Sequence, residues 1–152
     1  MKTTHVIFAM FFALTIFSLS SCNKDKEISK PEIKNFELGH DNSNSAYPGS
    51  DLHIEADIVA EGKINRIEIK IHHEGEHGKK FASYILSEGE WEVDSTYVKF
   101  SGLKNTIFHE DLDIPADAET GDYHFHFAVI DMEGNKAEVE RELEIKLSAP
   151  VK

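Results

Sequence analysis

The sequence contains a single cysteine, Cys22, and only one methionine, Met132, beyond its first 21 residues. One cysteine cannot form an intrachain disulfide, so the fold must be stabilised by packing. The scarcity of sulfur ligands also disfavours a soft copper(I) site. Basic residues are few as well, since 16 Lys and Arg against 28 Asp and Glu give a net charge of −12. An acidic surface of this kind excludes nucleic acid as a partner and attracts metal cations.

The first 22 residues predict secretion and lipid attachment. An apolar run from Val6 to Phe17 follows the basic residue Lys2 and ends in Leu19-Ser20-Ser21-Cys22. This order predicts a signal peptide over residues 1–21 rather than a membrane-spanning helix. The ending looks like a bacterial lipobox, in which cleavage before Cys22 leaves a thiol that carries lipid. We therefore expect an outer-membrane lipoprotein, held in the bilayer through acylated Cys22 and facing the periplasm or the cell surface. The alternative is an ordinary secretory signal with an incidental cysteine.

Cleavage leaves 131 residues with a net charge of −13, because the signal contains one lysine and no acid. This length suits one domain with a single core. Polar residues 22–30 are expected to form a lipidated tether that ends before Pro31. Residues 31–147 are expected to form the domain, and residues 148–152 a short C-terminal tail.

Apolar and polar residues alternate with period two over most of the domain, which predicts an all-β fold. The expected strands are Glu32–Leu38, Asp51–Ala60, Ile64–His72, Thr106–Ile114, Asp122–Asp131 and Ala137–Leu147, with a turn-rich loop over 41–49. Aromatic and apolar residues between 79 and 104 suggest two further strands of undefined register. This number and spacing of strands predicts an immunoglobulin-like β-sandwich of about seven to eight antiparallel strands. The segment Glu119-Thr120-Gly121-Asp122-Tyr123-His124-Phe125 also follows the pattern of a tyrosine corner.

Eight histidines remain after the signal: His40, His53, His72, His73, His77, His109, His124 and His126. Because consecutive antiparallel strands reverse direction, most of these positions are expected at one pole of the sandwich. With Tyr123 and Phe125 facing the core, His124 and His126 point outward with Cα atoms about 7 Å apart. His72 is expected beside them, with the loop from His73 to His77 above. Three imidazoles and an open position are a known zinc arrangement.

A second candidate site lies on the other predicted sheet. His53, Glu55 and Asp57 point outward from one strand, and His109, Asp111 and Asp113 from its neighbour. This patch would form one site with the first candidate site if the histidines of both sheets lie close together at that pole. The ligand types favour zinc, copper(II) or nickel, whereas calcium would suit only the carboxylates. A solvated, histidine-rich surface without metal is the alternative interpretation.

Several segments carry a resemblance to a known family. They are the lipobox, Gly49–Glu55, Ile69–His72, Phe108–Glu110, Ile114–Asp117, Gly121–His126 and Asp131–Asn135. Together they resemble a family of His-rich lipoprotein domains of unknown function that is common in Bacteroidota. The resemblance covers most of residues 31–147 and implies a periplasmic or surface-exposed lipoprotein with an immunoglobulin-like fold. It implies no activity.

These observations favour a non-catalytic lipoprotein that captures or passes on zinc or copper(II) in the cell envelope. Its core ligands would be His72, His124 and His126, with His53 and His109 as a second set, and an envelope protein would be a further partner. Binding should fade below about pH 6, as protons compete with metal for imidazole. The alternative is an adhesion or accessory module that binds protein or glycan through its loops, with Tyr84, Trp91 and Tyr97 as contacts. We expect no enzyme, because the sequence contains no serine elbow, Cys–His pair or phosphate loop.

Overall fold

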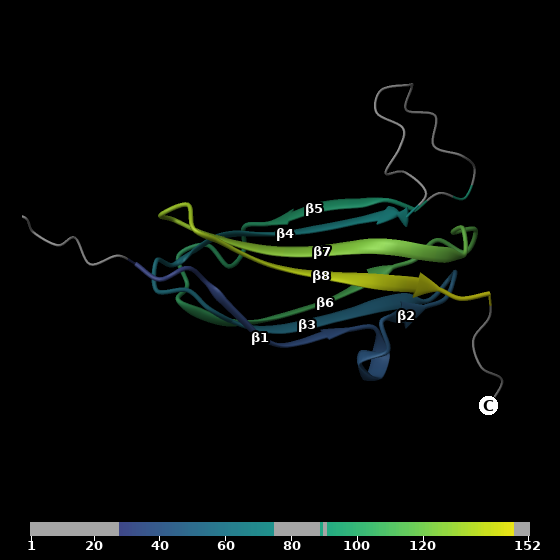
Figure 1. The fold of residues 1–152 in the computed structure, drawn as a ribbon, viewed down its shortest axis with the longest axis horizontal. Coiled ribbons are helices and arrows are strands. Elements are labelled where there is room, and N and C mark those ends of the chain that lie inside the picture. Colours follow the sequence, from purple (N-terminus) through teal and green to yellow (C-terminus); the bar gives the residue numbers. More distant parts are fainter. Residues whose placement is uncertain (1–27, 75–88, 90, 148–152) are drawn as a thin grey trace, which may run out of the picture.

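The computed structural model describes residues 28–74, 89 and 91–147, which form a sandwich of two β-sheets (Figure 1). A three-stranded sheet contains, in order, β1 (Glu32–Leu38), β3 (Asp51–Val59) and β6 (Asn105–Asp113). A five-stranded sheet contains β2 (Ser45–Ala46), β8 (Lys136–Ile145), β7 (Gly121–Asp131), β4 (Ile64–His73) and β5 (Val93–Tyr97). A 3-10 turn, η1 (His40–Asn42), links β1 to β2. The predicted all-β sandwich is confirmed.

The order of the strands is that of an immunoglobulin-like fold. The expected neighbours pair as predicted, since β3 pairs with β6 and β4 pairs with β7, both antiparallel. The short strand β2 runs parallel to β8. None of the described residues forms a helix long and apolar enough to cross a membrane.

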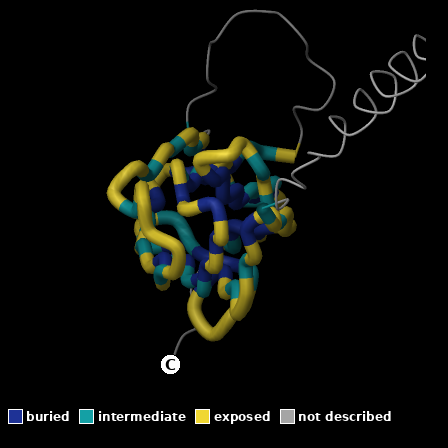
Figure 2. Tube along the Cα trace, turned by 90° about the vertical axis from the view of Figure 1, so that its left-hand side faces the viewer, coloured by how far each residue is buried: buried dark blue, intermediate teal, exposed yellow. Residues whose placement is uncertain are grey.

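Successive side chains of a strand point to opposite faces of its sheet. Residues that alternate between apolar and polar therefore form strands with one buried face and one solvent-facing face. Leu52, Ile54 and Ile58 of β3 are buried, as are Phe125 and Phe127 of β7. Figure 2 shows the buried segments gathered in the middle of the molecule with exposed segments around them. Burial of each of these large side chains contributes about 1.5–3 kcal/mol, so the core holds the sheets together without a disulfide.

Aromatic rings connect the two sheets at the centre of the core. The ring centroids of Phe108 on β6 and Phe127 on β7 lie 5.1 Å apart at 72°. Phe36 of β1 lies 5.4 Å from Phe127, and Tyr97 of β5 lies 5.1 Å from Phe108. Edge-to-face packing of this kind fixes the outward direction of the residues between them.

The structure corrects the prediction for the loop 41–49, and it describes only part of the segment 79–104. The expected loop 41–49 contains β2, whose two buried residues are too few to show a periodic pattern. In the described part of 79–104 there is one strand, β5, while Phe100 lies in a turn. The structure does not describe residues 1–27, 75–88, 90 and 148–152, which include Cys22, His77, Tyr84 and most of the predicted tether.

The predicted tyrosine corner is confirmed at the start of β7. The Tyr123 hydroxyl donates a hydrogen bond of 2.7 Å to the carbonyl oxygen of Glu119. The ring is almost fully buried and lies against Trp91, with centroids 5.9 Å apart. The corner therefore fixes the chain where it enters β7, immediately before His124.

The other end of β7 is fixed by a buried carboxylate. Asp131 is fully buried and accepts hydrogen bonds from the backbone N–H groups of Glu133 (3.0 Å) and Asn135 (2.7 Å), and from Asn135 Nδ2 (2.9 Å). A Cβ atom on Gly62 would lie 2.6 Å from Asp131 Oδ2, so this close approach requires glycine. Asp131 thus closes the turn between β7 and β8 at the pole where the chain enters the sandwich.

Candidate metal centres

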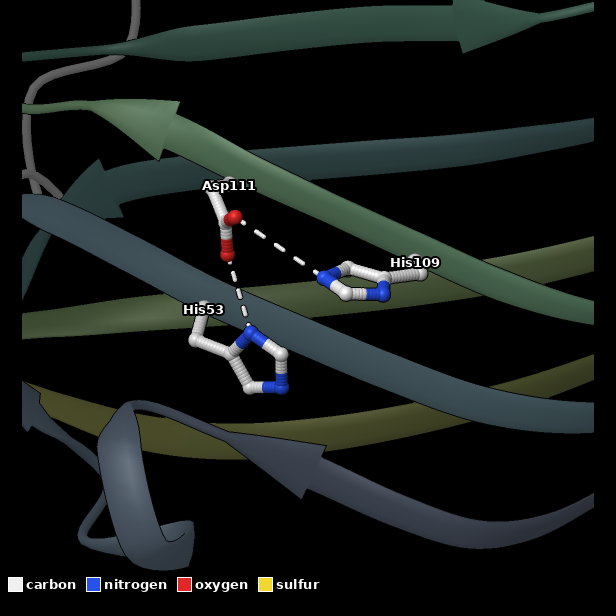
Figure 3. Close-up of side chains that lie close together, drawn as sticks. All are labelled: His53, His109 and Asp111. Carbon is white, nitrogen blue, oxygen red and sulfur yellow. Dashed lines mark hydrogen bonds and ion pairs between the residues drawn. The ribbon is translucent and has the colours of Figure 1, made fainter.

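Antiparallel pairing of β3 with β6 places a histidine opposite an acid twice in succession. The register sets His53 opposite Asp111 and Glu55 opposite His109. Ile54, between His53 and Glu55 on β3, and Phe108, next to His109 on β6, are buried, so all four side chains lie on the outer face of the three-stranded sheet. Figure 3 shows three of them, His53, His109 and Asp111. The sequence predicted the shared face, and the register adds that each histidine meets a carboxylate.

His53, His109 and Asp111 form what we call the β3–β6 centre. Each offers one ligand atom, and these three atoms lie within 4.8 Å of one another. His53 Nδ1 lies 2.9 Å from Asp111 Oδ1, and His109 Nε2 lies 3.8 Å from Asp111 Oδ2. The rings of the two histidines meet edge to face, with centroids 5.0 Å apart.

These distances match what a metal ion requires. Zinc binds imidazole nitrogen and carboxylate oxygen at about 2.0–2.2 Å, so two ligands of a tetrahedral site lie about 3.3–3.5 Å apart. The two separations from Asp111 fall on either side of that value.

Two further residues support this arrangement. Glu55 Oε2 lies 3.9 Å from His109 Nδ1, the ring nitrogen that does not face Asp111. This separation is an ion-pair contact and is too long for a hydrogen bond. A carboxylate that closes on the second nitrogen of a ligating histidine would fix the ring orientation and raise its basicity. His40 stacks on His53 with centroids 5.8 Å apart, and its Nε2 lies 2.8 Å from Asp51 Oδ2.

His40 reaches this position through a glycine. Gly39 has φ of +74°, a conformation that residues with side chains rarely adopt. A Cβ atom there would also lie 2.8 Å from the backbone oxygen of Ser45. Gly39 thereby permits the tight turn η1 that directs His40 back over β3.

The same neighbours keep Asp111 ionised. The hydrogen bond with His53 lowers the pKa of Asp111 below its ordinary value of 3.8, against a smaller opposing effect of desolvation. Positive charge on His53, His109 or His40 lowers this pKa further. A carboxylate that remains charged at neutral pH is suited to bind a cation.

The outer face of the five-stranded sheet carries the three other clustered histidines. His72 on β4 pairs directly with His124 on β7, and their ring centroids lie 5.4 Å apart. The His72 ring also stacks on His126 at 5.4 Å and 11°. The sequence therefore identified the three imidazoles that share this face.

Two acids of β8, which were not predicted as ligands, lie close to His126. His126, Glu138 and Glu140 form what we call the β7–β8 centre, with one ligand atom from each within 4.8 Å of the others. The outward series Glu138, Glu140, Glu142 and Glu144 on the final strand was the signal that would have found them. It gains meaning only once β8 is known to lie beside β7.

The two centres lie on opposite outer faces of the sandwich, so the two predicted sites do not merge. Stacked sheets are about 10 Å apart, and the ligands on each point away from the core between them. His40 joins the β3–β6 centre, as described above. His73 joins neither, because its ring packs against buried Tyr123 with centroids 5.0 Å apart. His77 lies outside the described residues.

Of the aromatic residues proposed as contacts for protein or glycan, the structure describes two, one buried and one partly buried. Trp91 is only 6% exposed and belongs to the core. Tyr97 is partly buried against Phe108. Desolvation, with a smaller effect of Glu110, raises the pKa of Tyr97 above its usual value of 10.0. Tyr84 lies outside the described residues.

Fold and surface together define an immunoglobulin-like β-sandwich with a histidine–carboxylate group on each outer face that could hold a metal ion. Residues 20–146 match a domain of unknown function, DUF4625. The chain therefore belongs to the DUF4625 family. None of the curated proteins matches it.

Solved structures show similarity of fold alone. OgpA from Akkermansia muciniphila shares 8% identity with a TM-score of 0.51, over 78% of this chain and 29% of that chain. Spo0M, a sporulation control protein from Bacillus subtilis, shares 10% identity with a TM-score of 0.47, over 80% of this chain and 51% of that chain. The chain thus spans less than a third of OgpA and about half of Spo0M.

Proposed function

We propose that this protein is a non-catalytic binder of a divalent transition metal, zinc or copper(II), and that the β3–β6 centre holds the ion. The observation that carries the proposal is the approach of His53, His109 and Asp111 to within 4.8 Å of one another. Two imidazoles and one carboxylate form a ligand set that suits zinc and copper(II). Solvent would complete the coordination.

The charge around the β3–β6 centre supports capture of a cation. Asp51 lies opposite Asp113 across the ladder, and Asp57 lies on the same face. Acids directly opposite one another repel, and a bound cation relieves that repulsion. His109 and Asp111 are about half exposed, which suits an ion that is taken up and passed on rather than buried permanently.

The proposed cellular setting is that of an envelope lipoprotein anchored through Cys22. Its support comes from the lipobox-like sequence and from where the described chain enters the sandwich. Ser29 Oγ donates a hydrogen bond of 3.0 Å to Glu61, which follows the end of β3. Figure 1 shows the chain entering the sandwich at this end of β3. β7, which has 11 residues and connects the two poles, spans about 35 Å. A lipid on Cys22 would therefore hold His53 and Asp111 on the part of the domain farther from the membrane, with His126 midway along the sandwich.

Zinc titration of the chain from Asn23 onward, which contains every residue of both sheets, tests the proposed function. Asp111→Asn should weaken zinc binding at least tenfold, because it removes one ligand and its charge. Asp113→Asn is the matched control, since it makes the same change on the same face of the same strand. Equal zinc affinity in both variants and the unmodified chain would contradict the proposal.

Anchoring is tested separately in cells. Cys22→Ser should move the protein out of the membrane fraction, because the lipid attachment atom is lost. Retention of the Cys22→Ser protein in that fraction would contradict the lipoprotein assignment without affecting the metal centre.

A further inference from the structure

We infer that the five-stranded sheet carries a second, independent divalent-cation site, formed by His126, Glu138 and Glu140, which takes a harder ion such as Mn²⁺ as well as zinc. The inference extends the proposed function, because it treats both outer faces of the sandwich as metal-binding surfaces. Its ligand set differs from the three histidines that the sequence suggested for this face.

The three ligands converge because of the register between β7 and β8. His126 lies directly opposite Glu140, and Glu138 is two residues further along the same face. His126 Nδ1 lies 3.5 Å from Glu140 Oε1 and 3.8 Å from Glu138 Oε1. Both values are close to the spacing of about 3.3–3.5 Å between neighbouring ligands of one small ion. An unbroken antiparallel ladder over both strands fixes these positions.

The carboxylates have oxygen atoms available for an ion. Glu138 uses Oε2 to bind Lys136 Nζ at 2.8 Å, and its other oxygen, Oε1, is the one that faces His126. Among the described side chains, the only ion-pair partner of Glu140 is His126. Lys70, which lies opposite His126 on β4, is instead directed to Asp94 at 3.2 Å. The cations nearby therefore leave the negative charge of this centre only partly compensated.

Neighbouring imidazoles enclose the centre on its β4 side. The stacked ring of His72 covers His126, whose side chain is 28% exposed. The β7–β8 centre is thus partly shielded from solvent by His72 and more open on the side of β8. Partial shielding strengthens the attraction between carboxylates and a cation.

The two centres differ in the hardness of their ligands. The β3–β6 centre has two nitrogens and one oxygen, whereas the β7–β8 centre has one nitrogen and two oxygens. Imidazole suits zinc, copper(II) and nickel, and carboxylate suits manganese and magnesium. We therefore expect Mn²⁺ to prefer the β7–β8 centre, while copper(II) prefers the β3–β6 centre.

Mn²⁺ is the probe for the experiment, because it broadens the NMR signals of nearby amides and so reports where it binds. In the chain from Asn23 onward, substoichiometric Mn²⁺ should broaden amides of β7 and β8 around His126 before those of β3 and β6. The double variant Glu138→Gln/Glu140→Gln should weaken Mn²⁺ binding at least tenfold. His126→Ala should weaken it as well, which separates ligation from simple charge attraction.

Glu142→Gln/Glu144→Gln is the matched control, since it removes two acids from the same face of β8. The inference is overturned if this control weakens binding as much as Glu138→Gln/Glu140→Gln, or if broadening is confined to β3 and β6. His53→Ala/His109→Ala should leave the β7–β8 broadening unchanged. Zinc binding that depends on Asp111, without Mn²⁺ broadening at β7–β8, would retain the proposed function and reject this second site. Mn²⁺ broadening at β7–β8, together with zinc binding that is unchanged by Asp111→Asn, would retain this second site and reject the proposed function.

Discussion

The carboxylates at the two poles of the sandwich differ in how their hydrogen bonds are arranged. At the pole where the chain enters, Asp131 is fully buried and accepts three hydrogen bonds from fixed donors. At the histidine pole, Asp111 is about half exposed and pairs with imidazoles whose protonation can change. Fixed donors on every side suit a carboxylate that stabilises a turn. Exchangeable partners suit a carboxylate that binds a ligand.

This contrast shows why the presence of acidic residues alone does not identify a binding site. Both poles carry acids, but Asp131 meets backbone N–H groups of its own turn, whereas the register between β3 and β6 brings Asp111 to an imidazole. An acid opposite a histidine can exchange a proton for a metal ion, whereas an acid bound by backbone donors cannot do so without breaking the turn.

The largest expected effect is on stability at the entry pole. Asp131→Ala should lower the free energy of unfolding by about 2–4 kcal/mol, because buried donors lose a charged acceptor. Urea denaturation of the variant and the unmodified chain measures the difference. Zinc affinity of the folded variant should be unchanged. Loss of stability below about 1 kcal/mol would remove the proposed difference between the poles.

A smaller effect is expected on affinity at the histidine pole. Glu55→Gln should weaken zinc binding about tenfold, since Glu55 orients His109 without being a ligand. Competition with a chromophoric chelator measures this change. Asp57→Asn, two residues along the same face of β3, is the control. If the two variants behave alike, Glu55 acts through general charge and not through His109.

A moderate loss of stability is expected at the start of β7. Tyr123→Phe removes the hydrogen bond to Glu119 and should cost about 1 kcal/mol, less than the loss of Asp131 at the other end of the strand. Thermal or urea unfolding measures it. A cost as large as that of Asp131→Ala would mean that the histidine pole is fixed as firmly as the entry pole.

The smallest expected effect is a change in one pKa. His53→Ala should raise the pKa of Asp111 toward 3.8, because the hydrogen bond that lowers it is lost. Since the lowered pKa belongs to the folded state, this pair stabilises the fold above about pH 4 and the contribution disappears as pH falls through the pKa of Asp111. Carboxyl carbon chemical shifts measured against pH provide the value. An unchanged Asp111 titration would mean that His53 does not hold this carboxylate.

Individual strands show how much of the fold could be predicted from the sequence. Alternation of apolar residues predicted β3 and β7 within a residue of their ends, because each has one fully buried face. The tyrosine corner was predictable from a local pattern around Tyr123. The two-residue strand β2 was not, because its burial depends on contact with residues of β8 that lie 99 positions later in the chain.

For the candidate sites, the alternation of side chains along each strand identified which histidines point outward, since neighbouring core residues fix the buried face. This alternation does not define which residue of the adjacent strand lies opposite each histidine. The pairing of His53 with Asp111 and of His126 with Glu140 arises from the offsets between strands far apart in sequence.

The amino-acid sequence by itself determined the sandwich and the outward direction of the clustered histidines, because these follow from period-two burial. Tertiary structure alone decided that there are two separate histidine–carboxylate groups and that acids from β8 belong to one of them. The reason is physical: two sheets have two outer faces, and only the hydrogen-bonded register of each ladder brings particular side chains within reach of one ion.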